Sequence, residues 1–321
     1  MSNLDTNRDD WLVRTVLEDW NEADRPLPWR SIRDPWLILV SELMSQQTQM
    51  ARVVPSWERF VAEFPDPASV ARSTPARVVE LWAGLGYNRR AIHLHQCATM
   101  IVEVHRGAVP DTLDDLMALP GVGPYTARAV MAFAFESDVG VLDTNVGRIL
   151  ARFDGTTYAP VDAQRRADAL VPAGDAWRWN QALLDLGAGT CVKRAPKCEA
   201  CAVRARCAWA GEGADPAIRS AGVSASQSRF VGSDRQGRGR LISALREHPI
   251  HRNDLAKTMG WPDDVDRAEA VAAGIVRDGL ANIIDDRYVL PGSAVTGETG
   301  HIVRSVQNVC PSVDGNKAIS C

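Results

Sequence analysis

The sequence predicts an all-α fold, and three observations support this prediction. Apolar residues recur three and four positions apart from about residue 11 to 206, for example over 36–44, 76–85 and 127–135, which is the period of a helix with one buried face. Alternating patterns typical of strands are nearly absent from this region. Short breaks rich in Pro, Gly or Asp separate helical stretches of about 8–15 residues.

The composition is that of a soluble protein with about two domains. The chain has 321 residues, of which 45% are hydrophobic and 24% are charged, and single cores stop growing at roughly 250–300 residues. The apolar stretch 129–135 is far shorter than the about 20 residues that span a bilayer. No leader with an apolar centre and a cleavage site opens the chain. We therefore expect a cytoplasmic protein without a membrane partner.

The helical region 31–140 contains a tight turn with the sequence LPGVGPYTA at 119–127. Pro120 ends one helix, Gly121 and Gly123 permit the turn, and an apolar helix resumes after it. Backbone N–H groups at such a helix start can bind a phosphate. The segment is therefore either a plain joint between two helices or a helix–hairpin–helix element that binds a DNA phosphate without reading sequence.

The next helix begins about 20 residues later, at the sequence LDTNV over 142–146. Asp143 precedes apolar positions at Val146, Ile149 and Leu150, so it has a structural role as the N-cap of this helix. In the functional alternative, the positive end of the helix keeps the carboxylate ionised. Asp143 would then be ready to stabilise a developing cation.

Four of the seven cysteines follow within 17 residues. Cys191, Cys198, Cys201 and Cys207 have the spacing C-x6-C-x2-C-x5-C. Zinc sites usually pair two close units across a longer loop, whereas this run has one close pair flanked by single cysteines. Four thiolates on a compact loop can equally hold a [4Fe–4S] cluster. The spacing favours iron–sulfur over zinc, and either over thiols without a metal.

Basic residues surround these cysteines and give the loop 191–207 a net charge of +4. The cations either offset the charge of metal-bound thiolates on a solvated loop or face DNA phosphates, where counterion release rewards clustered cations. They are Lys193, Arg194, Lys197, Arg204 and Arg206, against Glu199.

In order and approximate spacing, the hairpin, Asp143 and the cysteine run resemble the helix–hairpin–helix DNA glycosylase superfamily with its iron–sulfur loop. Further motifs resemble one branch, the MutY-type adenine DNA glycosylases, which excise adenine mispaired with 8-oxoguanine or guanine. These motifs are RPLPWR at 25–30, SELMSQQT at 41–48, GLGY at 84–87 and NQ at 180–181. The resemblance implies a monomeric base excision repair enzyme of the bacterial cytosol and nucleoid, with double-stranded DNA as its partner.

The resemblance implies catalytic roles for four residues. Glu42, in an apolar helix where burial would raise its pKa, would protonate adenine at N7 as the general acid. Asp143 would stabilise or capture the oxocarbenium-like sugar, and Asn145 would order Asp143 or the attacking water. Tyr125 would line the nucleotide pocket. Because the endonuclease III branch has a Schiff-base lysine at that position, a tyrosine predicts a monofunctional enzyme that leaves an abasic site.

The resemblance also implies residues that bind DNA, the base and the cluster. Gln47 and Tyr87 match the family's wedge residues, which fill the gap that the extruded base leaves, and Thr48 would lie beside the orphaned partner. Ser45 replaces a leucine of most members, which predicts a looser or wetter pocket. The pocket residues are Arg25, Trp29, Arg30 and Gln181, the phosphate-binding residues are Gly121 and Gly123, and the ligands of a [4Fe–4S] cluster are Cys191, Cys198, Cys201 and Cys207.

The catalytic region is predicted to span residues 1–210 in two lobes. A six-helix lobe occupies about 31–140 and contains the hairpin 119–127. An iron–sulfur lobe combines 1–30 with 141–210.

The rest of the chain is predicted to contain one further module. Residues 211–228 are rich in Gly, Ala and Ser and predict a linker. Three short helices (241–245, 255–259 and 268–278) and a hairpin at 283–290 predict a small winged-helix-like module over 229–291. This module resembles the shortened C-terminal region of actinobacterial-type relatives. The tail 292–321 lacks periodicity and is predicted to be disordered.

Charge is distributed unevenly along the chain. The net charge is −4, from 36 Lys and Arg against 40 Asp and Glu, but residues 191–252 carry twelve cations against five acids. Positive charge therefore gathers where the resemblance predicts DNA.

Two other functions remain open from the sequence. A mismatch glycosylase for thymine or another pyrimidine would share Tyr125 and Asp143 but not the full run from Glu42 to Thr48. A non-catalytic, zinc-containing DNA-binding protein would use the same hairpin and basic loop.

Overall fold

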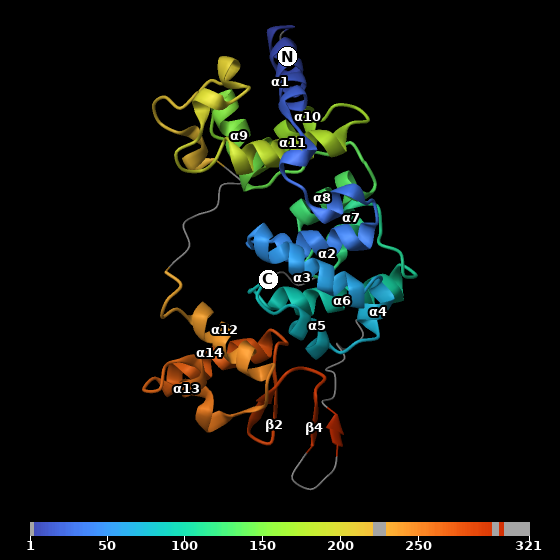
Figure 1. Cartoon of the computed structure of the whole chain (residues 1–321), viewed down its shortest axis with the longest axis vertical. Helices are drawn as coiled ribbons and strands as arrows, with labels where there is room; N and C mark the ends of the chain where they lie inside the picture. Colours follow the sequence, from blue (N-terminus) through green and yellow to red (C-terminus); the bar gives the residue numbers. More distant parts are fainter. Residues whose placement is uncertain (1–2, 221–228, 297–301, 305–321) are drawn as a thin grey trace, which may run out of the picture. The chain divides into compact units, whose positions relative to one another are not determined.

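The computed structural model describes residues 3–220, 229–296 and 302–304. The chain forms two compact units (Figure 1). One comprises Met1–Arg72 and Gly84–Arg229, and the other comprises Ser73–Ala83 and Phe230–Cys321. Within the described residues, no helix is both long and apolar enough to cross a bilayer.

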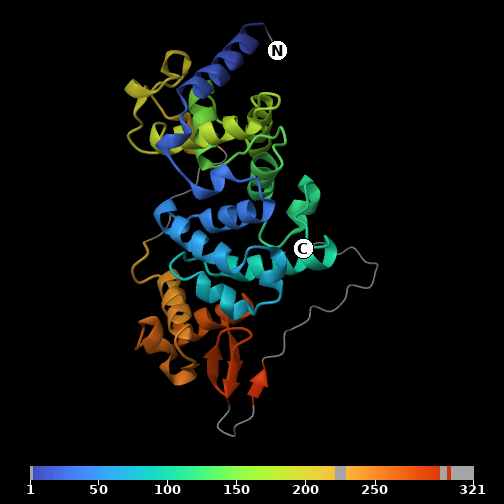
Figure 2. The same cartoon turned by 45° about the vertical axis from the view of Figure 1, so that its right-hand side comes forward.

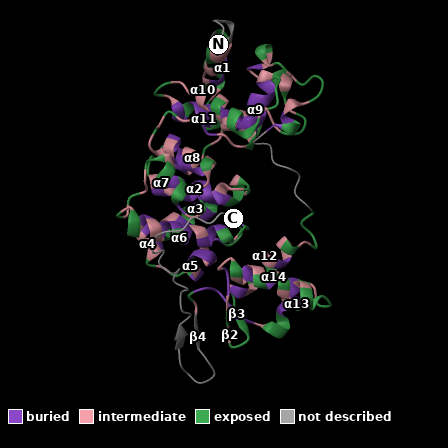
Figure 3. Cartoon of the chain, turned by 180° about the vertical axis from the view of Figure 1, so that it is seen from behind, coloured by how far each residue is buried: buried purple, intermediate pink, exposed green. Residues whose placement is uncertain are grey.

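One lobe of the first unit is built around a helix that is buried along most of its length. Pro35–Ser45 forms α2, whose N-cap Asp34 accepts hydrogen bonds from the backbone N–H groups of Trp36 and Leu37. Helix α2 packs against α3 and α8. Its residues 38–44 are all buried, and Figure 3 colours the chain by this burial. The other helices of this lobe are α3 (Met50–Glu63), α4 (Pro67–Ala71), α6 (Arg89–Val104), α7 (Leu113–Ala118) and α8 (Pro124–Ala134).

The second lobe brings the N-terminal helix onto helices from the middle of the chain. Helix α1 packs on α11, which also packs on α9 (Figure 1). Leu12, Phe153 and Trp179 belong to the shared core, and Cys191, Cys201 and Cys207 pack against its edge. The helices are α1 (Asn3–Asp19), α9 (Thr144–Asp154), α10 (Pro160–Ala169) and α11 (Ala176–Gly189).

The region 31–140 holds seven helices, six of which belong to this lobe. The seventh, α5 (Pro75–Leu81), belongs to the second unit. The helix predicted over 76–85 ends at Leu81, and the positive φ angles of Gly84 and Gly86, 85° and 70°, are incompatible with its continuing to residue 85.

The second unit has the element order and sheet topology of a winged helix. Helix, strand, helix and helix are followed by a hairpin, and the sheet order is β1-β3-β2 (Figures 1 and 2). Asp285 and Asp286, between β2 and β3, both have positive φ angles, as a tight two-residue hairpin turn requires. The elements are α12 (Asp234–Leu245), β1 (Ile250–His251), α13 (Leu255–Met259), α14 (Val265–Arg277), β2 (Asn282–Ile284) and β3 (Arg287–Val289).

Several arginines of this unit are engaged inside it. Arg238 pairs with Asp278, Arg252 pairs with Glu269 at 3.0 Å, and the Arg246 Nε donates to the Val79 carbonyl at 3.1 Å. The Val79 contact holds α5, as does the hydrogen bond from the Ala76 N–H to the Pro291 carbonyl at 2.9 Å. These cations therefore stabilise the unit itself.

The predicted linker and tail contain more structure than expected. Asp215 pairs with Arg152 at 2.7 Å and the Ser220 Oγ accepts from the Tyr158 N–H, so residues 211–220 pack on the first unit, whereas 221–228 lie outside the described residues. In the tail, β4 (Ala294–Thr296) pairs antiparallel with β5 (Ile302–Arg304). The rest of the predicted disordered tail after residue 296 lies outside the described residues.

Candidate active site

A cavity of about 430 Å³ in the first unit brings together residues from distant parts of the sequence. Its lining comes from the segment before α2, from α2 and the loop after it, from α8, from the start of α9 and from α11. Ten residues singled out from the sequence line it: Arg25, Trp29, Arg30, Glu42, Gln47, Thr48, Tyr125, Asp143, Asn145 and Gln181.

Glu42 is the buried acid of this cavity. Glu42 is 7% exposed, and its Oε2 is buried without a hydrogen-bond partner among the described residues. Burial raises the pKa of Glu42 to about 7; a hydrogen bond from Tyr125 opposes this shift, and the charge of Asp143 adds to it. The side chain can therefore hold a proton near neutral pH and present it to a bound molecule.

This raised pKa predicts a pH-dependent cost to stability. Glu42 ionises near pH 4.5 in the unfolded chain but at about 7 in the folded one, so the free energy of unfolding falls as pH rises through this interval. Above this pH interval, the loss in the free energy of unfolding levels off at about 3 kcal/mol. We expect Glu42→Gln, which is never charged, to gain about that much relative to the wild type between about pH 4 and pH 8. Urea unfolding of both proteins across this range measures the difference, and parallel curves would contradict the assigned pKa.

Asp143 is the N-cap of α9 and also a wall of the cavity. Its Oδ1 accepts from the backbone N–H groups of Asn145 at 2.8 Å and Val146 at 2.7 Å. Its Oδ2 accepts from the Asn145 Nδ2 at 2.8 Å. Burial raises the pKa of Asp143, and these hydrogen bonds oppose the shift. The structural role and a position suited to catalysis therefore coexist in one side chain.

Asn145 connects Asp143 to the cysteine loop through an arginine that the sequence did not single out. Arg148 Nη2 donates to Asn145 Oδ1 at 2.8 Å, and Arg148 Nε donates to the Cys191 carbonyl at 2.7 Å. The signal for Arg148 was its position one turn after Thr144, the first residue of α9, next to the buried Ile149 and Leu150.

A second polar network fixes the opposite wall of the cavity. Arg30 Nε donates to Gln181 Oε1 at 3.0 Å, and Arg30 Nη2 donates to Asp185 Oδ1 at 2.7 Å. Arg25 donates to the same oxygen at 2.9 Å. Burial opposes ionisation of Asp185, but hydrogen bonds from Arg30, Trp20 and Arg25 outweigh it and lower its pKa. Sequence reasoning missed Asp185, although it follows Gln181 by one helical turn.

The Ser45 hydroxyl does not leave an unsatisfied polar group in the cavity. Its Oγ donates to the Ser41 carbonyl of the same helix at 2.7 Å.

Trp29 has both a packing role and a place in the cavity lining. It is buried and packs edge-to-face on Trp57, with ring centroids 5.5 Å apart.

Three of the predicted DNA-binding residues lie outside this lining. Tyr87 is 38% exposed and has a φ of 46°. Gly121 has a φ of 80°, and a Cβ there would lie 2.7 Å from the Cβ of His93, so the turn between α7 and α8 requires glycine. Gly123 is the N-cap of α8, with Pro124 in the first turn.

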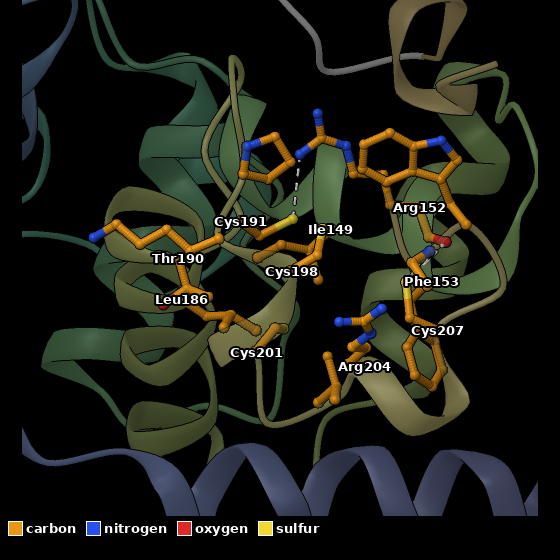
Figure 4. Close-up of a pocket in the computed structure, with 15 residues that line it drawn as sticks. Ile149, Arg152, Phe153, Leu186, Thr190, Cys191, Cys198, Cys201, Arg204 and Cys207 are labelled. Atoms are coloured by element: carbon orange, nitrogen blue, oxygen red, sulfur yellow. Dashed lines mark hydrogen bonds between the residues drawn. The ribbon is translucent and has the colours of Figure 1, made fainter. Parts of the chain in front are cut away.

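The four cysteines surround a second cavity (Figure 4). Arg152 Nη1 donates to Cys191 Sγ at 3.4 Å, and the Ala210 N–H donates to Cys207 Sγ at 3.3 Å. Gly211, with a φ of 93°, leaves room beside Cys198, where a Cβ would lie 3.1 Å from the sulfur. Among the described residues, no three His, Cys, Asp or Glu side chains converge as a single metal ion requires.

Comparison with known proteins places these features in a family. Residues 40–172 match the HhH-GPD superfamily of base excision DNA repair proteins. The chain is 40% identical over 287 residues to the adenine DNA glycosylase of Mycobacterium tuberculosis, covering 86% of this chain and 92% of that protein. The chain belongs to the adenine DNA glycosylase family. The enzyme of Mycolicibacterium smegmatis is 37% identical over 290 residues, with 88% and 97% covered.

Membership of the adenine DNA glycosylase family extends beyond the catalytic region. An alignment over 86% of the chain must include part of the second unit, in agreement with the resemblance to actinobacterial-type relatives. A solved thermostable thymine-DNA glycosylase has the same fold, with a TM-score of 0.62 and 29% identity, over 65% of this chain and 99% of that one. The all-α helix–hairpin–helix fold predicted from the sequence is confirmed.

Proposed function

We propose that this chain removes adenine mispaired with 8-oxoguanine or guanine from double-stranded DNA by hydrolysing its N-glycosidic bond. The observation that carries the proposal is the pairing of a buried, proton-holding Glu42 with the hydrogen-bonded carboxylate of Asp143 in one cavity. The membership of the adenine DNA glycosylase family supports adenine as the base.

The two carboxyl groups divide the chemistry. Adenine is a poor leaving group until its ring is protonated, and Glu42 supplies that proton at N7. As the bond breaks, positive charge develops on the sugar, and Asp143 stabilises or captures it before water adds. The Asp143 charge also helps to keep Glu42 protonated.

The cavity walls and the exposed loops would bind the extruded base and the DNA. Arg30 holds the Gln181 carboxamide through its Oε1, which leaves the Nε2 to donate to a ring acceptor of adenine. Gln47 and Tyr87 would fill the gap in the stack, with Thr48 beside the orphaned base. Gly121 and Gly123 would bind a phosphate through their backbone at the start of α8.

Tyr125 predicts the form of the product. A phenol cannot form a Schiff base with the abasic sugar, so the strand should remain intact after base loss. We expect cleavage of the product strand only after alkali, and no cross-link to DNA on borohydride reduction. A gel assay with and without alkali tests this, and full strand cleavage without alkali would overturn it.

A substrate panel separates adenine excision from the thymine alternative. Duplexes containing A:8-oxoguanine, A:G and T:G are compared under single-turnover conditions. We expect base loss from both adenine duplexes and none from T:G. Base loss confined to T:G would replace the proposed substrate with a pyrimidine.

We further propose that Cys191, Cys198, Cys201 and Cys207 hold a [4Fe–4S] cluster. The donor set fits this group: four sulfurs surround one cavity, and N–H groups donate to Cys191 and Cys207. When bound, the cluster would shape the basic loop 191–207, which we propose to face DNA.

The cluster proposal predicts iron that depends on these cysteines. The purified protein should be brown and contain about four iron and four sulfide per chain. We expect Cys198→Ser to lose most of both, whereas Cys97→Ala, at a buried cysteine in α6 outside the loop, should retain them. Colourless wild-type protein containing zinc would contradict this assignment.

A further inference from the structure

Two exposed loops beside the cavity carry residues in unfavourable backbone conformations. Gln47, in the loop after α2, has a φ of 55°, and Tyr87, in the loop before α6, has a φ of 46°. Residues other than glycine avoid this region, and they hold it where the surrounding contacts determine the backbone. These are the two residues that the proposed function assigns to the gap in the base stack.

One buried guanidinium is bonded to both loops. Arg90, the second residue of α6, is 7% exposed. Its Nη1 donates to the carbonyl oxygens of Leu43 at 2.8 Å, Met44 at 2.9 Å and Gln46 at 2.6 Å. Its Nη2 donates to the Gly86 carbonyl at 3.0 Å. The first three acceptors lie at the end of α2, and the last immediately precedes Tyr87.

Further contacts close the connection between the loops. Arg90 Nη2 also donates to Thr48 Oγ1 at 3.0 Å and to the Leu85 carbonyl at 3.3 Å, and Thr48 Oγ1 donates to the same Leu85 carbonyl at 3.2 Å. The Arg90 guanidinium carbon lies 5.6 Å from the centroid of the Tyr87 ring. Lysine could not reproduce this set, because a single ammonium lacks the planar fork that reaches several acceptors at once.

We infer that Arg90 is a positioning residue that fixes the loops of Gln47 and Tyr87 relative to each other. Both side chains can then enter the base stack together when adenine is extruded. This inference rests on the proposed function. Arg90 does not line the cavity itself and reaches it only through Thr48, away from Glu42 and Asp143, so its effect should fall on extrusion rather than on protonation. It follows that loss of Arg90 should slow base release without changing how the reaction responds to pH.

The test compares Arg90→Met and Arg90→Lys with Arg72→Met, a matched change at an exposed arginine that follows α4. Extrusion is measured as the fluorescence rise of 2-aminopurine placed at the adenine position opposite guanine, in the Glu42→Gln background. Chemistry is measured as the single-turnover rate of adenine release from A:G across pH. We expect Arg90→Met to lose most of the fluorescence rise and about 100-fold in rate, with an unchanged pH midpoint. Arg72→Met should match the wild type in both measurements.

The outcomes distinguish this inference from the proposed function. A normal fluorescence rise in both Arg90 variants, or a rate loss accompanied by a shifted pH midpoint, would overturn the positioning role. If Arg90→Met does not fold, the inference is tested with Arg90→Lys instead. This variant keeps the positive charge but should still lose part of the 2-aminopurine fluorescence rise. A wild-type protein that releases adenine from no duplex would instead reject the proposed function itself.

Discussion

Glu42→Gln is expected to lower adenine release from an A:8-oxoguanine duplex by about 1,000-fold, the scale of a positioned general acid. Glutamine has the same shape and fits the same buried position, but it has no proton to give. Binding of the duplex should remain close to that of the wild type, because Glu42 contributes a proton rather than a charge when the base enters. Single-turnover rates and a gel-shift titration measure the two quantities separately.

The control for this change is Glu58→Gln, on the exposed face of α3. It should leave both the rate and the affinity unchanged. In the wild type, the rate should also fall as pH rises through about 7, where Glu42 loses its proton. Normal turnover by Glu42→Gln would exclude Glu42 as the acid.

Asp143→Asn is expected to cost about 100- to 1,000-fold in the rate of base release, the scale of losing one electrostatic group aimed at developing charge. The substitution is informative because asparagine caps helices about as well as aspartate. The cap of α9 should therefore survive, and only the negative charge beside the sugar is lost.

The matched control is Asp66→Asn, since Asp66 caps α4 by accepting from the Ser69 N–H at 2.7 Å. Both variants should melt within a few degrees of the wild type, and only Asp143→Asn should lose activity. Asp143→Ala should in addition lose about 1 kcal/mol of stability with its cap. If Asp143→Asn turned over at the wild-type rate, Asp143 would be a helix cap and nothing more.

The parts of the site that depend on local sequence were predictable. The apolar residues around Glu42 make α2 helical and buried, and that burial raises the pKa of the carboxyl. Asp143 precedes an amphipathic helix, so its N-cap position could be predicted directly from the sequence. The two aspartates at 285 and 286 likewise indicated the turn of the hairpin.

The parts that depend on long-range contacts were not predictable. Arg90, Arg148 and Asp185 are charged residues in helices, and such residues are usually solvated. Only the folded chain shows that carbonyl oxygens and opposite charges surround them. The contacts between α5 and the C-terminal segment and the three-residue strand β4 leave no periodic pattern for the same reason.

The proposed reaction in this cavity is the protonation and release of adenine. It is tested most directly by incubating excess protein with an A:8-oxoguanine duplex and identifying the released base by mass spectrometry. We predict free adenine in an amount equal to the alkali-labile sites formed, and neither product with Glu42→Gln. Release of no base, or of adenine in equal amounts from the wild type and Glu42→Gln, would contradict this account.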